Sequence, residues 1–228
     1  MLFRSDRFSS TYSDELARSL GGLASVDNAL KSKLVLIDSL LGDVLSTPGS
    51  RVLDFGCGTG LLLQHLGGLC AGAFGLDVSL QSLKATRGLR TAQFDGKQIP
   101  LASNSLDCAL AVCVFHHITE SKRADILAEL GRVLNPQGKL VIIEHNPFNP
   151  LTRWVVGRCE FDRHAELLSP GQLQRLMMSA GFSTISRGHF FAVPPWTKWL
   201  SRADAMLARL PLGAQHYGMY TPATQTEY

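Results

Sequence analysis

The chain of 228 residues lacks several features that mark specialised classes of protein. Its five cysteines are odd in number and include no C-x-x-C pair, which argues against a disulfide scaffold and a zinc ribbon. No apolar run approaches the roughly 18 residues that a membrane-spanning helix needs. The formal net charge is only +3 and no dense basic run is present, so we do not expect a nucleic-acid partner.

What is present fits one folded domain. Apolar residues make up 45% of the chain, which is too many for a disordered protein, and the net charge is low. The length allows one domain with a sizeable core. The first residues have no apolar core of the kind that a secretory signal needs, so we expect a reduced, cytoplasmic protein.

Short apolar runs alternate with helical patterns along most of the chain. The predicted strands are residues 51–55, 73–77, 90–94, 106–115 and 139–143, the last entered from a turn at 135–138. Between them the apolar period changes to about 3.6 residues, most clearly in a helix after residue 121 and in a second helix that begins with Ser169 and Pro170. This alternation predicts an α/β fold with a Rossmann-like, doubly wound, mostly parallel sheet.

Both ends of the chain depart from that alternation. Residues 1–48 predict one or two helices, the second at 25–45, which would cover the globular unit of residues 49–228 as a lid. The C-terminal part predicts a strand at 182–193, a helix at 196–210 and a strand at 216–220. These two strands would pair antiparallel at one edge of the sheet.

A glycine-rich turn follows the first predicted strand. Gly56, Gly58 and Gly60 alternate after Asp54 and lead into a helix. Glycines let the backbone turn tightly and let a ligand approach closely, and the helix start offers unpaired N–H groups. The G-x-G-x-G spacing differs from the dinucleotide-binding G-x-G-x-x-G. Asp77 ends the second predicted strand, where a carboxylate can accept both hydroxyls of a ribose. An ordinary turn and a helix cap are the plain alternatives.

These residues and three later runs resemble the signature motifs of class I S-adenosylmethionine-dependent methyltransferases, of the type that acts on small molecules. The matching runs are residues 52–60, 75–79, 94–107 and 130–140. One departure is Gln137, where the family often has glycine. The resemblance implies S-adenosylmethionine as cofactor and methyl transfer by in-line displacement to a small-molecule acceptor, such as a sugar, a lipid-linked glycan or a natural-product intermediate.

The resemblance also implies a cofactor site at the ends of the first four strands. Its members would be Asp54, Gly56, Gly58, Asp77, Val78, Asp95, Gly96 and Val114. Gly56, Gly58 and Val114 would border the methionine moiety, with Asp54 shaping the loop. Asp77 would bind the ribose, and Leu76 or Val78 would pack on the adenine. Asp95 would face the exocyclic amine. The alternative for Asp95 is a turn-forming aspartate before a glycine.

Polar side chains follow the fourth and fifth predicted strands, at the edge where ligands of such sheets bind. They include His116, His117, Glu144 and His145. A general base is needed when the methyl acceptor is a hydroxyl or a carbon acid, and histidine suits that role. The candidate catalytic residues are therefore His145, His116 and Glu144. Their alternative is a structural pair that holds the following loop.

Two expectations concern the histidines themselves. Adjacent side chains diverge on an extended backbone, so we expect only one of His116 and His117 to face the cleft. The histidines form no helical i, i+4 pair and the cysteines are not arranged with them, so no metal site is predicted.

Two other functions stay open. A catalytically silent, methyltransferase-like partner subunit would bind the cofactor without turnover, and the intact glycines and acids argue mildly against it. An NAD(P)-dependent oxidoreductase could use the same sheet, but the glycine spacing does not support it.

Overall fold

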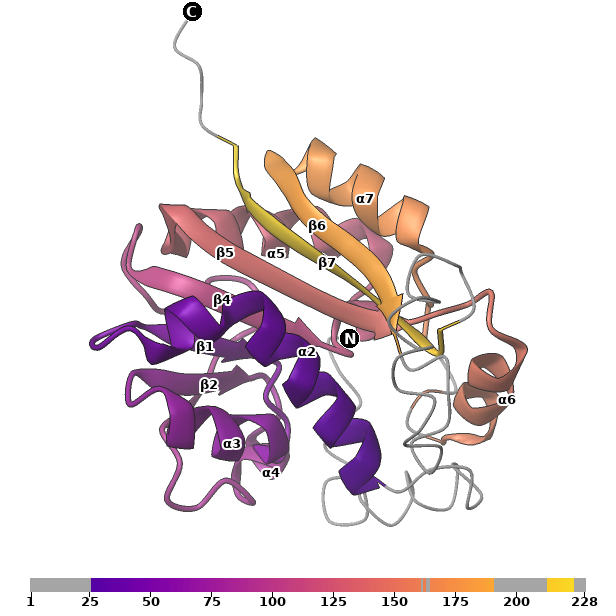
Figure 1. The fold of residues 1–228 in the computed structure, drawn as a ribbon, viewed down its shortest axis with the longest axis horizontal. Helices are drawn as coiled ribbons and strands as arrows, with labels where there is room; N and C mark the ends of the chain where they lie inside the picture. The colour runs from indigo at the N-terminus through magenta and orange to yellow at the C-terminus, as the bar shows by residue number, and fades with distance from the viewer. Residues whose placement is uncertain (1–25, 161, 163–164, 191–212, 224–228) are drawn as a thin grey trace, which may run out of the picture.

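A seven-stranded sheet lies at the centre of the computed structural model, which describes residues 26–160, 162, 165–190 and 213–223. The strands are β1 Val52–Phe55, β2 Ala73–Asp77, β3 Thr91–Gln93, β4 Leu106–Val112, β5 Leu134–His145, β6 Phe182–Phe190 and β7 Gln215–Pro222. Their order across the sheet is β3-β2-β1-β4-β5-β7-β6 (Figure 1).

The pairing confirms the predicted Rossmann-like fold. Strands β1 to β5 pair in parallel, and β7 pairs antiparallel with both β5 and β6. Strands β2 and β3 follow one another on one side of β1, and β4 pairs with the other side of β1. The strand order thus reverses between β1 and β4, and ligands of such sheets bind beyond the carboxyl ends of the strands at that point.

Helices cover both faces of the sheet. They are α2 Val26–Ser46, α3 Leu61–Leu69, α4 Leu80–Leu83, α5 Glu120–Val133, α6 Pro150–Arg158 and α7 Pro170–Ser179, with a 3-10 turn, η2, at Phe115–His117. None of these described helices is long and apolar enough to cross a membrane.

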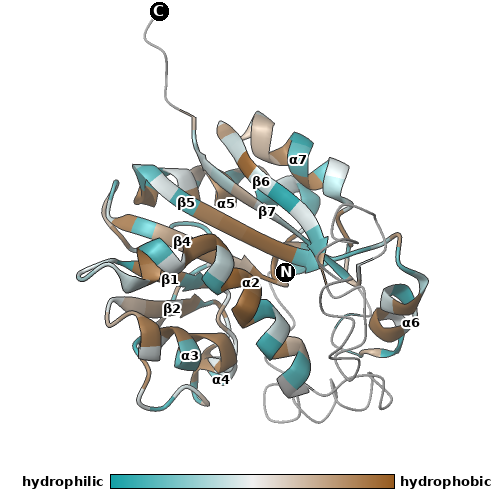
Figure 2. Cartoon of the chain, viewed as in Figure 1, coloured by the Kyte–Doolittle hydropathy of each residue, from teal (hydrophilic) through white to brown (hydrophobic). Residues whose placement is uncertain are grey.

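The core is divided by the sheet into two layers. Along β5, Leu140 and Ile142 pack with α5 and α7, whereas Val141 and Ile143 pack with α2 and α3. All four side chains are fully buried, as expected for a central strand covered on both faces, and the apolar stretch of β5 is visible in Figure 2.

Several predicted elements are confirmed. Helix α7 begins with a complete capping box, in which Ser169 and Gln172 satisfy each other's backbone N–H groups, followed by Pro170. Helix α2 matches the predicted helix at 25–45, and β6 and β7 match the two C-terminal strands. The helix predicted at 196–210 and the first half of the predicted lid lie outside the described residues.

Two boundaries were predicted wrongly. Strand β4 ends at Val112, short of the predicted residue 115, because Cys113 adopts a left-handed backbone conformation with φ of 58°. The turn expected at 135–138 lies inside β5 instead, as an irregularity in its pairing with β4. There Asn135 Nδ2 donates to Asp107 Oδ1 at 2.7 Å, which anchors the extra residues to the neighbouring strand.

One helix was missed altogether. Helix α6 follows β5 where the sequence indicated only a loop. The Asn149 side chain accepts from the backbone N–H of Thr152, and Pro150 occupies the first turn. This cap and proline are a usual start signal for a helix.

The capping box makes a stability prediction. Replacement Ser169→Ala leaves the N–H of Gln172 without its side-chain acceptor, so the free energy of unfolding should fall by about 1 kcal/mol. Urea denaturation measures the change. Ser179→Ala, at an exposed position in the last turn of the same helix, is the control and should lose nothing. Equal stabilities of Ser169→Ala and the unchanged protein would show that the cap does not stabilise α7.

Candidate functional site

The glycine turn lies at the carboxyl end of β1. Gly56, Gly58 and Gly60 all have positive φ, at 74°, 54° and 80°. A Cβ atom at Gly56 would come within 2.6 Å of a Val114 methyl group, so the turn touches the end of β4 closely. A Cβ atom at Gly58 would meet nothing within 4 Å. The backbone at Gly58 therefore borders open space, where a ligand can approach it.

Asp77 ties this turn to the end of β2. Its Oδ2 accepts from the Gly58 N–H at 2.8 Å, and its Oδ1 accepts from the Ser79 N–H at 2.8 Å. A carboxylate offers about four acceptor positions, so these two bonds are compatible with further bonds to ligand hydroxyls.

Asp54, at the end of β1, is a buried acid beside a second one. It is only 2% exposed, and its Oδ2 has no hydrogen-bond partner among the described residues. Burial, and then the charge of Asp77, raise the pKa of Asp54 to about 7. Burial and the same two carboxylates also raise the pKa of Cys57. A cationic group placed here would relieve the repulsion between the acids.

The other predicted cofactor residues lie along the same edge. Val78 is half-buried and packs against the core, and Gly96 is buried with φ of 74°. Asp95 is exposed and accepts from the N–H groups of Lys97 at 2.8 Å and Gln98 at 3.0 Å. Asp95 thus forms the turn that was the alternative expectation for it.

Glu144 joins the ends of β4 and β5. Its side chain is wholly buried, and Oε1 accepts from the backbone N–H groups of Val114 at 3.2 Å and Phe115 at 2.7 Å. Its Oε2 lies 2.5 Å from His116 Nδ1. Burial by itself raises the pKa of Glu144, but the charge and hydrogen bond of His116 outweigh burial and lower the pKa to about 2. The Glu144 carboxylate contacts His116 Nδ1 and is not exposed to solvent.

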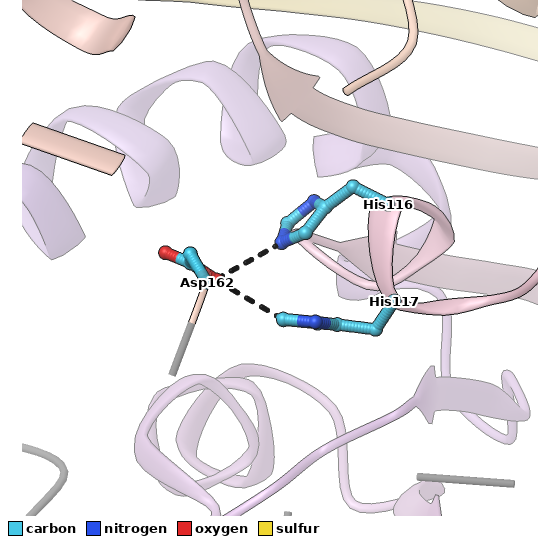
Figure 3. A group of neighbouring side chains, drawn as sticks. All are labelled: His116, His117 and Asp162. Carbon is cyan, nitrogen blue, oxygen red and sulfur yellow. Dashed lines mark ion pairs between the residues drawn. The ribbon is translucent and has the colours of Figure 1, made fainter. Parts of the chain in front are cut away.

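The turn η2 brings His116 and His117 together, and the expectation that they diverge is wrong. The two rings are 4.1 Å apart between centroids, because a 3-10 turn replaces the extended backbone there. Both Nε2 atoms approach Asp162 Oδ1, at 3.4 Å from His116 and 3.3 Å from His117 (Figure 3). His145 lies beside them, with its ring 5.1 Å from that of His116.

The charges of this cluster are coupled. Burial by itself lowers the pKa of His116, but Glu144 and Asp162 outweigh burial and hold the pKa well above its usual value. Burial lowers the pKa of His117. Burial by itself raises the pKa of Asp162, but its contacts with the two histidines outweigh burial and hold the pKa far below its usual value.

Cys113 lies between the histidine cluster and helix α2. Its Sγ accepts from Gln215 Nε2 at 3.2 Å and from Lys33 Nζ at 3.7 Å. Burial by itself raises the pKa of the thiol, but the charge of Lys33, with the charge and hydrogen bond of His145, lowers the pKa to about 6. Its positive φ is a strained conformation of the kind that gathers at functional sites.

Sequence reasoning missed Asp162, Cys113 and Lys33. Asp162 and Lys33 lie in segments that no motif covers, and only the fold brings them to the ends of β4 and β5. Cys113 directly follows β4, but no motif marked it as a candidate. The positions of the predicted residues His145, His116 and Glu144 at this edge agree with the order of the strands.

Comparison with known proteins finds a family model that matches the centre of the chain. Residues 53–142 match the family model described as a methyltransferase domain. The crystal structure of a SAM-dependent methyltransferase from Thermotoga maritima, described as a possible histamine N-methyltransferase, superimposes with a TM-score of 0.71. That superposition has 20% sequence identity and covers 96% of this chain and 99% of the other. At this identity it establishes a shared fold.

Curated relatives match over shorter stretches. An uncharacterized 37.1 kDa protein in a Streptomyces fradiae transposon is 33% identical over 196 residues, 77% of this chain and 54% of that protein. The demethylmenaquinone methyltransferase of Renibacterium salmoninarum is 35% identical over 111 residues, 46% of each chain. A tRNA (carboxymethyluridine(34)-5-O)-methyltransferase of Arabidopsis thaliana is 33% identical over 115 residues, 46% of this chain and 28% of that protein. The chain thus spans about half the length of the first relatives it matches.

The environment of Cys113 predicts an unusually reactive thiol. At pH 7 most of it is thiolate, so its alkylation by iodoacetamide should show an inflection near pH 6. Mass spectrometry of labelled peptides gives the rate at each cysteine. Cys108, which is wholly buried and whose pKa is raised by burial, should react far more slowly. Lys33→Met removes a nearby positive charge and should move the inflection upward. An inflection near the ordinary thiol pKa of about 8.5 would contradict this account.

Proposed function

We propose that the chain transfers a methyl group from S-adenosylmethionine to a small-molecule acceptor, because residues 53–142 match a methyltransferase domain and the fold is that of a solved S-adenosylmethionine-dependent methyltransferase. The pair of acids beside the open glycine turn is the observation that carries the proposal. Asp54 and Asp77 lie there close enough to raise the pKa of Asp54, and Asp54 Oδ2 has no hydrogen-bond partner among the described residues. S-adenosylmethionine brings a sulfonium and an ammonium charge to such a site.

The positions of the predicted residues support one orientation of the cofactor. We place its methionine end along Gly56, Gly58 and Val114, because the glycine turn and Val114 adjoin each other and Gly58 borders open space. The ribose hydroxyls would bond to Asp77 at the end of the next strand. The adenine would lie further along the edge, against Val78 and near Asp95 and Gly96.

The same pair of acids disfavours a dinucleotide. A pyrophosphate carries negative charge and needs a donor-lined cradle, whereas this site presents two carboxylates. The glycine spacing also differs from the dinucleotide fingerprint. An NAD(P)-dependent reaction is therefore the weaker candidate.

The close approach of Gly56 and Val114 supports a position of the histidine cluster next to the proposed cofactor. Val114 directly precedes η2, so an acceptor beside His116, His117 and His145 would lie at the methionine end. Holding acceptor and methyl group in line can lower the barrier by about 7–11 kcal/mol in favourable cases. If the acceptor is a hydroxyl or a carbon acid, we assign the role of general base to His145, which is half-buried. His116 lies beside it, and Glu144 positions His116.

A small molecule fits the charge of the chain better than a nucleic acid. The formal net charge is only +3, and binding to a phosphate backbone depends on many positive side chains. One relative is named for demethylmenaquinone and another for tRNA, so a single assay should test both classes of acceptor.

Cofactor binding should depend on pH. A cationic ligand favours ionised Asp54, whose pKa is about 7, so below that pH binding must release its proton and affinity should fall by up to about tenfold per pH unit. Isothermal titration calorimetry with S-adenosylmethionine, S-adenosylhomocysteine and NAD measures this. Asp54→Asn should bind without the inflection near pH 7, and Asp125→Asn, at an exposed position on α5, should keep it. Preference for NAD would overturn the assignment.

Turnover is tested with a labelled methyl donor. The protein is incubated with S-adenosylmethionine carrying a labelled methyl group and with cell extract separated into RNA, protein and low-molecular-weight fractions. We expect label in the low-molecular-weight fraction. Label in tRNA would contradict the small-molecule acceptor, and cofactor binding with no label in any fraction would indicate a non-catalytic partner subunit.

The base is tested in the same assay. His145→Ala should keep its affinity for S-adenosylmethionine and lose about 10²–10⁴-fold in turnover. His65→Ala, which changes an exposed histidine on α3, is the matched control and should keep full turnover. Unchanged turnover in His145→Ala would remove this residue from the mechanism.

A further inference from the structure

The histidine cluster holds a buried ring nitrogen that is not fully satisfied by its surroundings. His116 is 2% exposed, and among the described residues its Nε2 faces Asp162 Oδ1 at 3.4 Å without forming a well-aligned hydrogen bond. Its other ring nitrogen, Nδ1, lies 2.5 Å from Glu144 Oε2. Metal-ligating histidines usually donate one N–H to a carboxylate in this way, which leaves the second nitrogen to the metal.

Two further donors converge on the same point. His117 Nε2 and His116 Nε2 lie 3.3 Å and 3.4 Å from Asp162 Oδ1, and one ligand atom from each residue lies within 4.8 Å of the others (Figure 3). Bonds of about 2.0–2.2 Å in a tetrahedral zinc site put neighbouring donor atoms about 3.3–3.6 Å apart. The two measured separations agree with that spacing.

The backbone fixes these donors in place. Both histidines belong to η2, whose Phe115 carbonyl accepts from Arg123 Nε and whose His116 carbonyl accepts from the Glu166 N–H. Asp162 is held in its own turn, because its N–H donates to the Cys159 carbonyl. The ligand set therefore needs little rearrangement to receive an ion.

We propose that three side chains bind a divalent transition-metal ion of the zinc type. The ligand atoms are Nε2 of His116, Nε2 of His117 and a carboxylate oxygen of Asp162. Glu144 orients His116 through the hydrogen bond to its Nδ1. Two imidazoles and a carboxylate are the donors that such ions take, and three protein ligands leave a coordination position open. An oxygen of the bound small molecule is the natural fourth ligand. The proposal rests on these side chains alone and does not depend on methyl transfer.

The test is metal binding by the full-length chain without any methyl donor. The protein is treated with a chelator, returned to metal-free buffer, and titrated with Zn²⁺ by calorimetry. Co²⁺ is then used as a spectroscopic substitute, because its absorption distinguishes nitrogen and oxygen ligands from cysteine thiolates. We expect one equivalent to bind, with no thiolate charge-transfer band, and the melting temperature to rise on binding.

The variants locate the site. His117→Ala and Asp162→Asn change partly exposed side chains, so we expect both to fold, and each should bind at least tenfold more weakly than the unchanged protein. His65→Ala, on the exposed face of α3, should bind as the unchanged protein does. Should His117→Ala prove too unstable to titrate, His117→Gln offers a second measure, because it keeps a polar side chain of similar size and removes the imidazole, and it should also bind at least tenfold more weakly.

Three results would overturn the proposal. They are no binding by the unchanged protein, equal binding by His117→Ala and Asp162→Asn, or a cobalt spectrum dominated by thiolate ligands. In each case the cluster is an ion-pair network between histidines and carboxylates. None of these results would affect the cofactor assignment, which is measured with S-adenosylmethionine alone.

Discussion

The site depends on the hydrogen bonds that the buried Glu144 carboxylate accepts. This carboxylate accepts from the backbone of Val114 and Phe115 and holds His116 Nδ1, so it fixes the end of β4 relative to β5. Removing one partner of a buried charged pair commonly costs about 3–5 kcal/mol, which indicates how strongly this junction is constrained. Because Val114 adjoins Gly56, the same carboxylate aligns the histidine cluster with the glycine turn.

The pKa values of the buried carboxyls shift in opposite directions in the two halves of the site. Around the glycine turn, Asp54 lies near a second acid, Asp77, and burial and then the charge of Asp77 raise the pKa of Asp54 to about 7. Around η2, two carboxylates are matched by histidines, and their pKa values lie well below the ordinary range although both are largely buried. The first half is suited to a cationic ligand, and the second is suited to holding polar groups in fixed positions.

Local patterns in the sequence predicted the parts of the fold that short-range physics determines. The glycine turn needs positive φ at Gly56 and Gly58, the capping box needs Ser169 and Gln172, and the existence of the strands, though not every boundary, follows from apolar runs. The convergence of His116 and His117 could not be predicted, because it depends on a 3-10 turn that begins after the strained Cys113. Asp162 comes from a distant segment without a motif, so only tertiary packing brings it to the histidines.

The crystal structure of the complex with S-adenosylhomocysteine tests the central claim most directly. The account predicts the nucleoside between the glycine turn and the end of β2, with the ribose hydroxyls within hydrogen-bonding distance of Asp77. The amino group of the ligand should lie near Asp54. No bound ligand at this edge of the sheet under saturating S-adenosylhomocysteine, or a ligand bound away from Gly58, would contradict it.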